Sequence, residues 1–275
     1  MSNLEQLLRA FEYGYMWRAL LVGVSVSISS ATIGSFLVLK KYAMIGHGLS
    51  HVAFAAVAIG LVLNQAPLLF SLPLVVLSSI IILKLNHTAR LQGDASIALM
   101  AAFALALGTV LVSTSGGFNV DVYSYLFGSI LTIRQTDVYF AIGFSVAVVA
   151  FLLVYFTQLF SMTFDEDFAR ITDVKVSRLN MVLAILTGVT VVVGIQAIGT
   201  LLISALIIFP IIIAMQFNRS FKGTVGIATV VSIASVVSGL LISFVIDFPS
   251  GSTIVLLNSL VFFIIYSLRT ILGVR

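Results

Sequence analysis

The sequence predicts an all-α membrane protein whose helices cross a bilayer several times, and its composition carries this prediction. Hydrophobic residues make up 60% of the 275 positions and charged residues only 9%, against roughly 45–50% and 25% in soluble domains. The chain has 21 Phe beside 14 basic and 10 acidic residues. So few charged residues cannot cover the surface of a soluble domain of that length. We therefore expect one transmembrane domain over residues 1–275.

Nine apolar stretches without Asp, Glu, Lys or Arg approach the roughly 20 residues that a spanning helix needs. They cover residues 19–39, 42–63, 67–83, 96–115, 138–156, 181–197, 199–217, 223–246 and 252–268. The last part of 181–197 adjoins the next stretch without any charge, so the combined run is about twice one crossing in length. Glycines and an amide predict a tight turn between them at Gly194–Gly199, around Gln196.

The basic residues set the orientation, because Lys and Arg in short loops stay on the cytoplasmic side. One set of loops contains Lys40, Lys41, Lys84, Arg90, Arg170, Lys175, Arg178, Arg219, Lys222, Arg269 and Arg275. The alternate loops contain only Arg134. We therefore expect the N-terminus outside and the C-terminus in the cytoplasm, and the basic excess needs no nucleic acid to explain it. Residues 1–18 form an external segment or an amphipathic helix along the membrane surface.

Two short segments interrupt this pattern on the external side. Residues 122–133 are apolar but too short to cross, and counting them as a span would place the basic loop 157–180 outside. A re-entrant half-helix that returns near Arg134 resolves the conflict, since such backbone survives when buried in protein or lining a cavity. Residues 247–254 hold a Pro-Gly break. Together the two breaks predict an external gate, with two ordinary loops as the alternative.

His47 and His51 are the ionisable side chains that fall inside the predicted spans, four residues apart and so on one face of a helix. Polar groups at that depth are costly and usually mark a pathway or a site. Neutral imidazole is a common zinc ligand, so we interpret the pair as a transient metal site. The alternative is that each histidine hydrogen-bonds a neighbouring helix and stabilises the bundle.

Other metal chemistry is excluded by what the sequence lacks. The chain has no cysteine, so thiolate sites and disulfides are absent. The spacing His-x-x-x-His also occurs in zinc proteases, but Gly48 stands where those enzymes carry the Glu that acts as general base. An intramembrane protease is therefore rejected, and the sequence predicts no permanently bound cofactor and no catalytic residue.

The loop 157–180 is predicted to dock a soluble partner. An acidic cluster, Asp165, Glu166 and Asp167, opens a helix whose dipole favours negative charge there. Phe164, Phe168 and Ile171 follow at helical spacing, so one face is apolar although the loop lies in water. The alternative is a helix that lies on the lipid surface.

The chain contains no phosphate-binding Gly-Lys loop and no acidic relay inside a span. A permease with a docking helix and without an ATP site predicts a separate ATPase chain. A stand-alone intramembrane metal carrier is the alternative of a different class.

Several short stretches, in this order and spacing, resemble the permease subunits of bacterial ABC importers for zinc and manganese. They are Met44-Ile45-Gly46-His47-Gly48-Leu49-Ser50-His51, Tyr125-Leu126-Phe127-Gly128-Ser129-Ile130-Leu131, Thr163-Phe164-Asp165-Glu166, Leu206-Ile207-Ile208-Phe209-Pro210 and Pro249-Ser250-Gly251-Ser252. The resemblance covers almost the full chain. It implies the type II ABC importer architecture, with about nine spans, in a bacterial plasma membrane.

The resemblance also implies partners and site residues. The permease would form a homodimer with two cytoplasmic ATPases and an external metal-binding protein, surrounded by lipid. Residues 164–176 would contact the ATPase, with coupling through Phe164, Asp165, Glu166, Phe168 and Arg170. His47 and His51 would meet the metal. The family usually carries Asp at position 47, and an imidazole there favours Zn²⁺ over Mn²⁺, which remains the alternative.

Overall fold

The computed structural model describes residues 9–88, 93–114, 133–217 and 219–271, and within these ranges the regular elements are all α-helices. The main helices are α2 (Gly14–Leu39), α3 (Ile45–Val62), α4 (Pro67–Thr88), α5 (Gly93–Thr114), α7 (Gln135–Val154), α8 (Phe156–Phe164), α9 (Glu166–Ile171), α10 (Val176–Ile198), α11 (Thr200–Met215), α12 (Phe221–Ile246) and α13 (Ser250–Ile271). The predicted all-α class is confirmed.

Nine of these helices coincide with the nine predicted spans. Among the described residues, seven are long and apolar enough to cross a membrane: α2, α3, α5, α7, α10, α12 and α13. The other two have shorter apolar parts, Leu69–Leu85 in α4 and Leu202–Met215 in α11. The protein is therefore a multi-pass membrane protein, and nine is an approximate number of spans.

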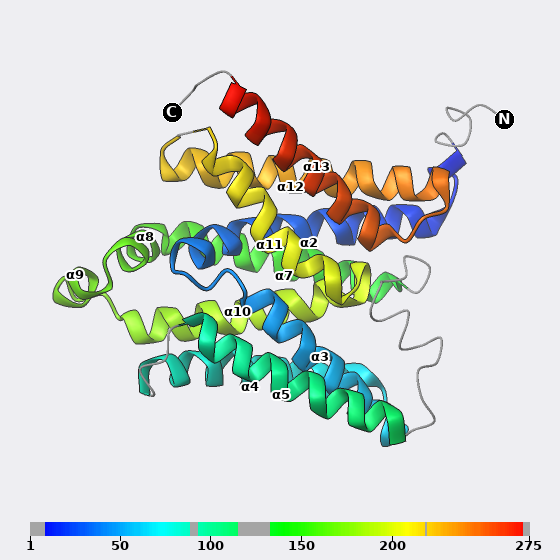
Figure 1. Ribbon diagram of the computed structural model, residues 1–275, viewed down its shortest axis with the longest axis horizontal. Helices are drawn as coiled ribbons and strands as arrows, with labels where there is room; N and C mark the ends of the chain where they lie inside the picture. Colours follow the sequence, from blue (N-terminus) through cyan, green and yellow to red (C-terminus); the bar gives the residue numbers. More distant parts are fainter. Residues whose placement is uncertain (1–8, 89–92, 115–132, 218, 272–275) are drawn as a thin grey trace.

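The spanning helices form three groups in space (Figure 1). Helices α2, α7, α10 and α11 lie in the middle, with α12 and α13 on one side and α3, α4 and α5 on the other. Helix α11 joins the groups, because it contacts α2 and α3 as well as α12 and α13. The short helices α8 and α9 project at one end of the bundle, the same end at which α13 finishes (Figure 1).

Several helix boundaries differ from the sequence prediction. Helix α2 begins at Gly14 and includes residues 14–18, which the prediction assigned to the N-terminal segment. The loop 157–180 contains α8, α9 and the start of α10. The predicted docking helix over 164–176 is therefore shorter, since α9 covers Glu166–Ile171. The predicted half-helix at 122–133 falls almost entirely in 115–132, outside the described residues.

The turn predicted between residues 194 and 199 is present, but it occupies only the last residue of that range. Helix α10 continues through Gly194 and ends at Ile198, and α11 begins at Thr200. Gly199 alone reverses the chain, with φ 93° and ψ 163°. Side chains other than hydrogen are strained at that φ, so the turn requires glycine.

The Pro-Gly break is also a turn. Helix α12 ends at Ile246, Asp247 adopts a left-handed conformation with φ 58°, and α13 begins at Ser250. The Ser243 hydroxyl donates to the Phe248 carbonyl at 2.6 Å and closes this turn.

Close helix contacts depend on small residues, as is typical of membrane bundles. A Cβ added at Gly34 on α2 would stand 3.1 Å from the carbonyl carbon of Ile207 and 3.2 Å from its Cα. Since both atoms belong to the α11 backbone, no side-chain movement could make room. Helices α2 and α11 therefore approach to a distance that only glycine permits.

Hydroxyl groups inside the bundle are mostly satisfied by their own helix. The Ser25 hydroxyl donates to the Leu21 carbonyl at 2.7 Å, and Thr187 donates to Leu183 at 2.7 Å. Most of the other described serine and threonine hydroxyl bonds also run to a carbonyl three or four residues earlier. Such bonds let a polar side chain lie in an apolar bundle without a partner on a neighbouring helix.

Candidate metal site and the helix that projects from the bundle

Helix α3 brings the two predicted histidines together. His47 lies in its first turn and His51 one turn later, since α3 begins at Ile45. Their Nε2 atoms are 3.3 Å apart, and the ring centroids are 4.6 Å apart with the ring planes at 81°. The Nε2 atoms of both rings therefore lie close enough together to reach one ion. At this distance one Nε2 can donate a proton to the other in a hydrogen bond, the direction depending on the tautomers.

Two glycines decide which face of α3 stays open. A Cβ at Gly46 would stand 2.8 Å from Ile207 Cδ1 on α11, and one at Gly48 would stand 2.6 Å from Ile97 Cγ2 on α5. Helices α11 and α5 thus cover these sides of α3. His47 is exposed and His51 is half-buried. The histidines consequently occupy a face that this chain leaves accessible.

The depth of the pair follows from the length of α3. The helix has 18 residues, so its centre lies between Ala53 and Phe54. At a rise of about 1.5 Å per residue, His51 is about 4 Å from that centre and His47 about 10 Å. Both are displaced toward the end of α3 that follows α2. His51 is thus near the middle of a spanning helix, as the sequence predicts.

Ser50 fixes α3 to the next element of the site. Its side chain is buried, and its hydroxyl lies 2.7 Å from the Gly46 carbonyl and 3.1 Å from the Thr200 carbonyl. Thr200 begins α11, directly after the Gly199 turn. The histidine helix is therefore attached to the reversal between α10 and α11.

No group of three or more His, Asp or Glu side chains suited to a metal occurs among the described residues. The described part of one chain thus offers two nitrogen ligands at this site, from His47 and His51. A four-coordinate ion would need the remaining ligands from water or from another chain.

The predicted docking residues lie on and next to α9. The Asp165 side chain accepts a hydrogen bond from the Phe168 amide at 2.9 Å and caps the helix. Glu166 pairs with Arg170 at 2.7 Å. The side chains of Phe164 and Phe168 are 59% and 57% exposed, and that of Ile171 is 82% exposed. The three apolar side chains are therefore exposed at the projecting end of the molecule, but they do not share one helix face as predicted, because Phe164 ends α8 while Phe168 and Ile171 lie on α9.

Lys40, which in the sequence serves only as a marker of orientation, has contacts that its position in the chain does not predict. Its ammonium group lies 2.6 Å from Asn180 Oδ1 and 3.7 Å from Glu166 Oε2, and its side chain is only 8% exposed. Burial lowers the pKa of Lys40, and the Glu166 carboxylate partly offsets this effect. Neither partner is near Lys40 in the sequence, so spacing could not have revealed the contact.

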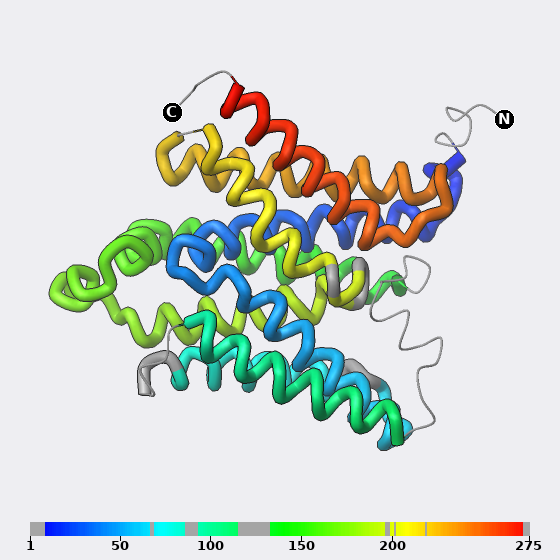
Figure 2. The backbone as a smooth tube through the Cα atoms, viewed as in Figure 1, coloured from blue at the N-terminus to red at the C-terminus, as the bar shows by residue number. Residues whose placement is uncertain are grey.

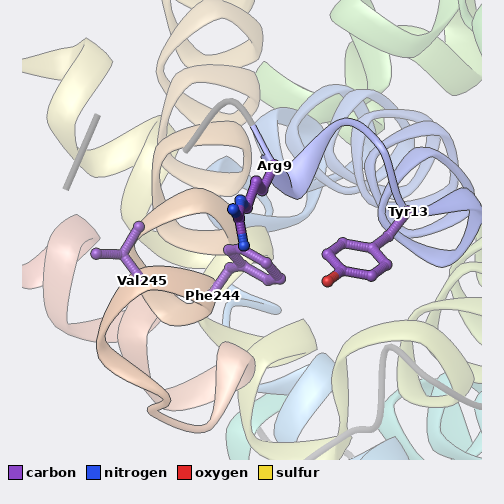
Figure 3. Close-up of a pocket in the computed structure, with 4 residues that line it drawn as sticks. All are labelled: Arg9, Tyr13, Phe244 and Val245. Carbon is purple, nitrogen blue, oxygen red and sulfur yellow. The ribbon is translucent and has the colours of Figure 1, made fainter. Parts of the chain in front are cut away.

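A pocket of about 210 Å³ lies at the other end of the bundle, lined by Arg9, Tyr13, Phe244 and Val245. In Figure 3, Arg9 and Tyr13 come from the N-terminal side of α2 and face Phe244 on α12. The pocket is thus separate from the histidines, which lie in the half of α3 that follows α2.

The fold and the paired imidazoles define a multi-pass membrane protein with a candidate metal-binding face. Residues 12–269 match the family model described as the ABC 3 transport family, and the chain belongs to this family. The resemblance expected from the sequence is confirmed, and the chain is a permease of the metal ABC transporter type.

Two curated relatives cover nearly the whole chain. The high-affinity zinc uptake system membrane protein ZnuB of Haemophilus influenzae is 32% identical over 248 residues, which cover 90% of this chain and 95% of that protein. The manganese transport system membrane protein MntC of Halalkalibacterium halodurans is 28% identical over 266 residues, or 95% of this chain and 90% of that protein. The relatives of this chain therefore include one named for zinc uptake and one named for manganese transport.

The fold is also similar to solved structures. PsaBC from Streptococcus pneumoniae in complex with Fab matches with a TM-score of 0.83 and 25% identity, over 96% of this chain and 95% of that chain. An inward-facing conformation of a putative metal-chelate type ABC transporter matches with a TM-score of 0.70 at 14% identity, over 92% and 85%. The expected ABC importer permease architecture is thus confirmed.

Proposed function

We propose that this chain is the permease subunit of an ATP-driven importer that carries Zn²⁺ into the cell. The observation that carries this proposal is the pair of Nε2 atoms of His47 and His51, 3.3 Å apart in the first half of α3. The ion is the transported substrate and not a resident cofactor. Membership of the ABC 3 transport family supports the class of transporter.

The spacing of the two nitrogens suits zinc. A tetrahedral site with Zn–N bonds of about 2.0–2.1 Å places neighbouring ligand atoms about 3.3–3.4 Å apart. The two Nε2 atoms are 3.3 Å apart, which is within this range. With both protons on Nδ1, both Nε2 lone pairs could bind one ion without a large change in the rings. Neutral nitrogen ligands also favour zinc over manganese, which prefers oxygen.

Two ligands make a weak site, which a transport pathway needs because the ion must leave again. Water or a second copy of the chain would complete the coordination. We propose a homodimer whose two open α3 faces border the shared pathway.

Replacing both histidines tests the proposal. The double variant His47→Ala/His51→Ala should lose uptake of radioactive zinc while the complex still assembles, because the ion loses its nitrogen ligands. His87→Ala is the matched control, since it removes the remaining histidine of the chain and should leave uptake unchanged. Normal zinc accumulation in the double variant would refute the assignment.

Import of Mn²⁺ is the alternative within the same family, and the relative named for manganese supports it. His47→Asp distinguishes the two, because a carboxylate adds a negative charge and an oxygen ligand. We expect that variant to shift competition from zinc toward manganese. If wild-type uptake is blocked by manganese more strongly than by zinc, the importer carries manganese.

We further propose that α9 contacts a separate ATPase, two copies of which would power the dimer. The exposed side chains of Phe164, Phe168 and Ile171 support an apolar contact. Asp165, Glu166 and Arg170 hold α9, which presents Phe168 and Ile171 beside Phe164 at the end of α8. Phe164→Asp/Phe168→Asp should stop co-purification with the ATPase. Unimpaired co-purification would show that the contact lies elsewhere.

The proposed setting is a bacterial plasma membrane with the N-terminus outside, the C-terminus inside and an external protein that delivers the metal. The chain has no cysteine, so single cysteines report orientation directly. Phe168→Cys should resist a membrane-impermeant maleimide in intact cells, and Tyr13→Cys should react. The reverse result would invert the topology. Zinc transport by the purified chain without nucleotide or partners would instead support a stand-alone carrier.

A further inference from the structure

Three elements meet at the side chain of Lys40: the end of α2, the start of α10 and the projecting helix α9. The Lys40 ammonium lies 2.6 Å from Asn180 Oδ1 on α10 and 3.7 Å from Glu166 Oε2 on α9. Glu166 at the same time holds Arg170 at 2.7 Å within α9. The buried ammonium therefore connects the proposed ATPase contact to the interior of the bundle.

The burial of Lys40 makes this connection different from an ordinary surface ion pair. Exposed pairs contribute little because water screens them. The Lys40 side chain is 8% exposed and that of Glu166 is 31% exposed, and Asn180 is buried. A buried ammonium that loses a partner is left uncompensated, so its position depends strongly on the groups around it.

The backbone after Lys40 passes directly to the histidine helix. Lys41 adopts a left-handed conformation with φ 62°. The Lys41 amide donates to the Val38 carbonyl, and the Tyr42 amide donates to the Leu37 carbonyl at 2.9 Å. This is a Schellman-type helix end, which fixes the direction of the exit. Figure 2 follows the chain from α2 through this tight turn into α3.

The far side of the turn is equally restrained. The Ile45 amide donates to the Tyr42 carbonyl at 3.1 Å, so α3 starts immediately after the turn. A Cβ at Gly93 would stand 3.2 Å from the Lys41 carbonyl oxygen and 3.1 Å from the Tyr42 ring, which shows that α5 packs tightly against it. Lys40 and His47 are seven residues apart, and backbone hydrogen bonds restrain the segment between them.

We propose that Lys40 is a positioning residue that transmits displacement of α9 to α3, and so couples the ATPase to the histidine face. The route runs from Glu166 through the Lys40 ammonium and the Schellman-type turn to His47. This inference rests on the proposed contact between α9 and an ATPase. It assigns Lys40 no contact with the ion.

Coupling is measured as metal transported per ATP hydrolysed by the reconstituted complex. Lys40→Met keeps the length and the buried stem but removes the charge, and we expect the ratio to fall about tenfold, within the usual range of coupling between sites. Co-purification with the ATPase should persist, because the exposed face of α9 is unchanged. Lys41→Met is the matched control: the same substitution at the next, exposed lysine should leave the ratio as in wild type.

A double variant tests whether Lys40 acts through Glu166. If it does, Lys40→Met/Glu166→Gln should be no more uncoupled than Lys40→Met alone, because both changes remove the same link. Additive losses would assign the effect to separate causes and overturn the proposed route. An unchanged transport ratio in Lys40→Met would overturn the whole inference.

A distance measurement separates this inference from the proposed function. Spin labels at Phe168→Cys and Met44→Cys, both exposed positions, report how α9 is held relative to the start of α3. Lys40→Met should broaden the distance distribution, and Lys41→Met should not. Identical distributions would overturn the positioning role. Absence of ATP-dependent uptake in wild type would defeat the proposed function, while these distances would still decide the role of Lys40.

Discussion

The tight contact between α3 and α5 predicts that a single methyl group at Gly48 disturbs the histidine face. In Gly48→Ala, the new Cβ would lie 2.6 Å from Ile97 Cγ2 and 3.4 Å from the Ile97 carbonyl oxygen. Packed carbon atoms normally lie about 3.5–4.0 Å apart, so one of the two groups must move by about 1 Å. Ile97 is 2% exposed, and Cγ2 is bonded directly to its Cβ. The clash therefore falls on the branched, rigid part of the Ile97 side chain, and rotation about its last bond cannot relieve it.

The expected cost follows from this geometry. Overpacking of a core costs about 1–3 kcal/mol, whereas Gly→Ala inside a helix returns about 1 kcal/mol of helix propensity. Gly143→Ala on α7 isolates the second effect, because a Cβ there meets nothing within 4 Å. The difference in stability between the two variants should therefore equal the overpacking cost, about 1–3 kcal/mol.

The assay is thermal unfolding of the purified protein in detergent, followed by metal uptake in cells. Gly48→Ala should unfold at a lower temperature than Gly143→Ala and transport less metal, because His47 lies next to the displaced residue. Adding Ile97→Ala removes the opposing methyl group, so the double variant should lose less than the sum of the two single losses. Equal unfolding temperatures for Gly48→Ala and Gly143→Ala would refute the tight contact.

The remaining predictions concern Lys40, Lys41 and Asp165, which lie where the end of α2 meets α9. Lys41→Gly should raise stability by about 1 kcal/mol, because glycine adopts the left-handed conformation without strain; an unfolding temperature at or below wild type would contradict this. Asp165→Ala should cost about 1 kcal/mol through loss of the cap on the Phe168 amide, and should weaken ATPase co-purification more than Asp167→Ala does. For pH dependence, burial lowers the pKa of Lys40 in the folded state, so the unfolded chain holds more protons as pH rises toward 10.5. Wild type should gain stability relative to Lys40→Met over that range, and a constant difference would show that Lys40 stays charged when folded.

Much of the fold could be predicted because a bilayer imposes a length on every apolar helix. Runs without charge located the nine helices, but charges did not mark their ends. Arg18 interrupts the first run, yet α2 begins at Gly14 and passes through it. Arg178 likewise lies inside α10, which begins at Val176. Helices extend beyond the hydrocarbon core, so a charged residue ends the apolar run without ending the helix.

The candidate site divides in the same way between local and distant contacts. The histidine pair could be predicted because residues four apart on a helix face the same direction. The cap at Asp165 is also a short-range contact, and its residue type predicts it. The contact of Lys40 with Glu166 and Asn180 joins segments more than a hundred positions apart. Spacing carries no information about such a pair, so only the fold reveals it.

The hydroxyl groups that bond to their own helices have a consequence for motion. Ser25, Thr187 and others already have their hydrogen bonds within one helix, so neighbouring helices can shear past each other without breaking them. The kinetic barrier to rearranging the bundle then comes mainly from apolar packing and from a few ties such as Ser50 to Thr200. Hydroxyl groups satisfied within their own helices therefore leave the relative positions of neighbouring helices free to change.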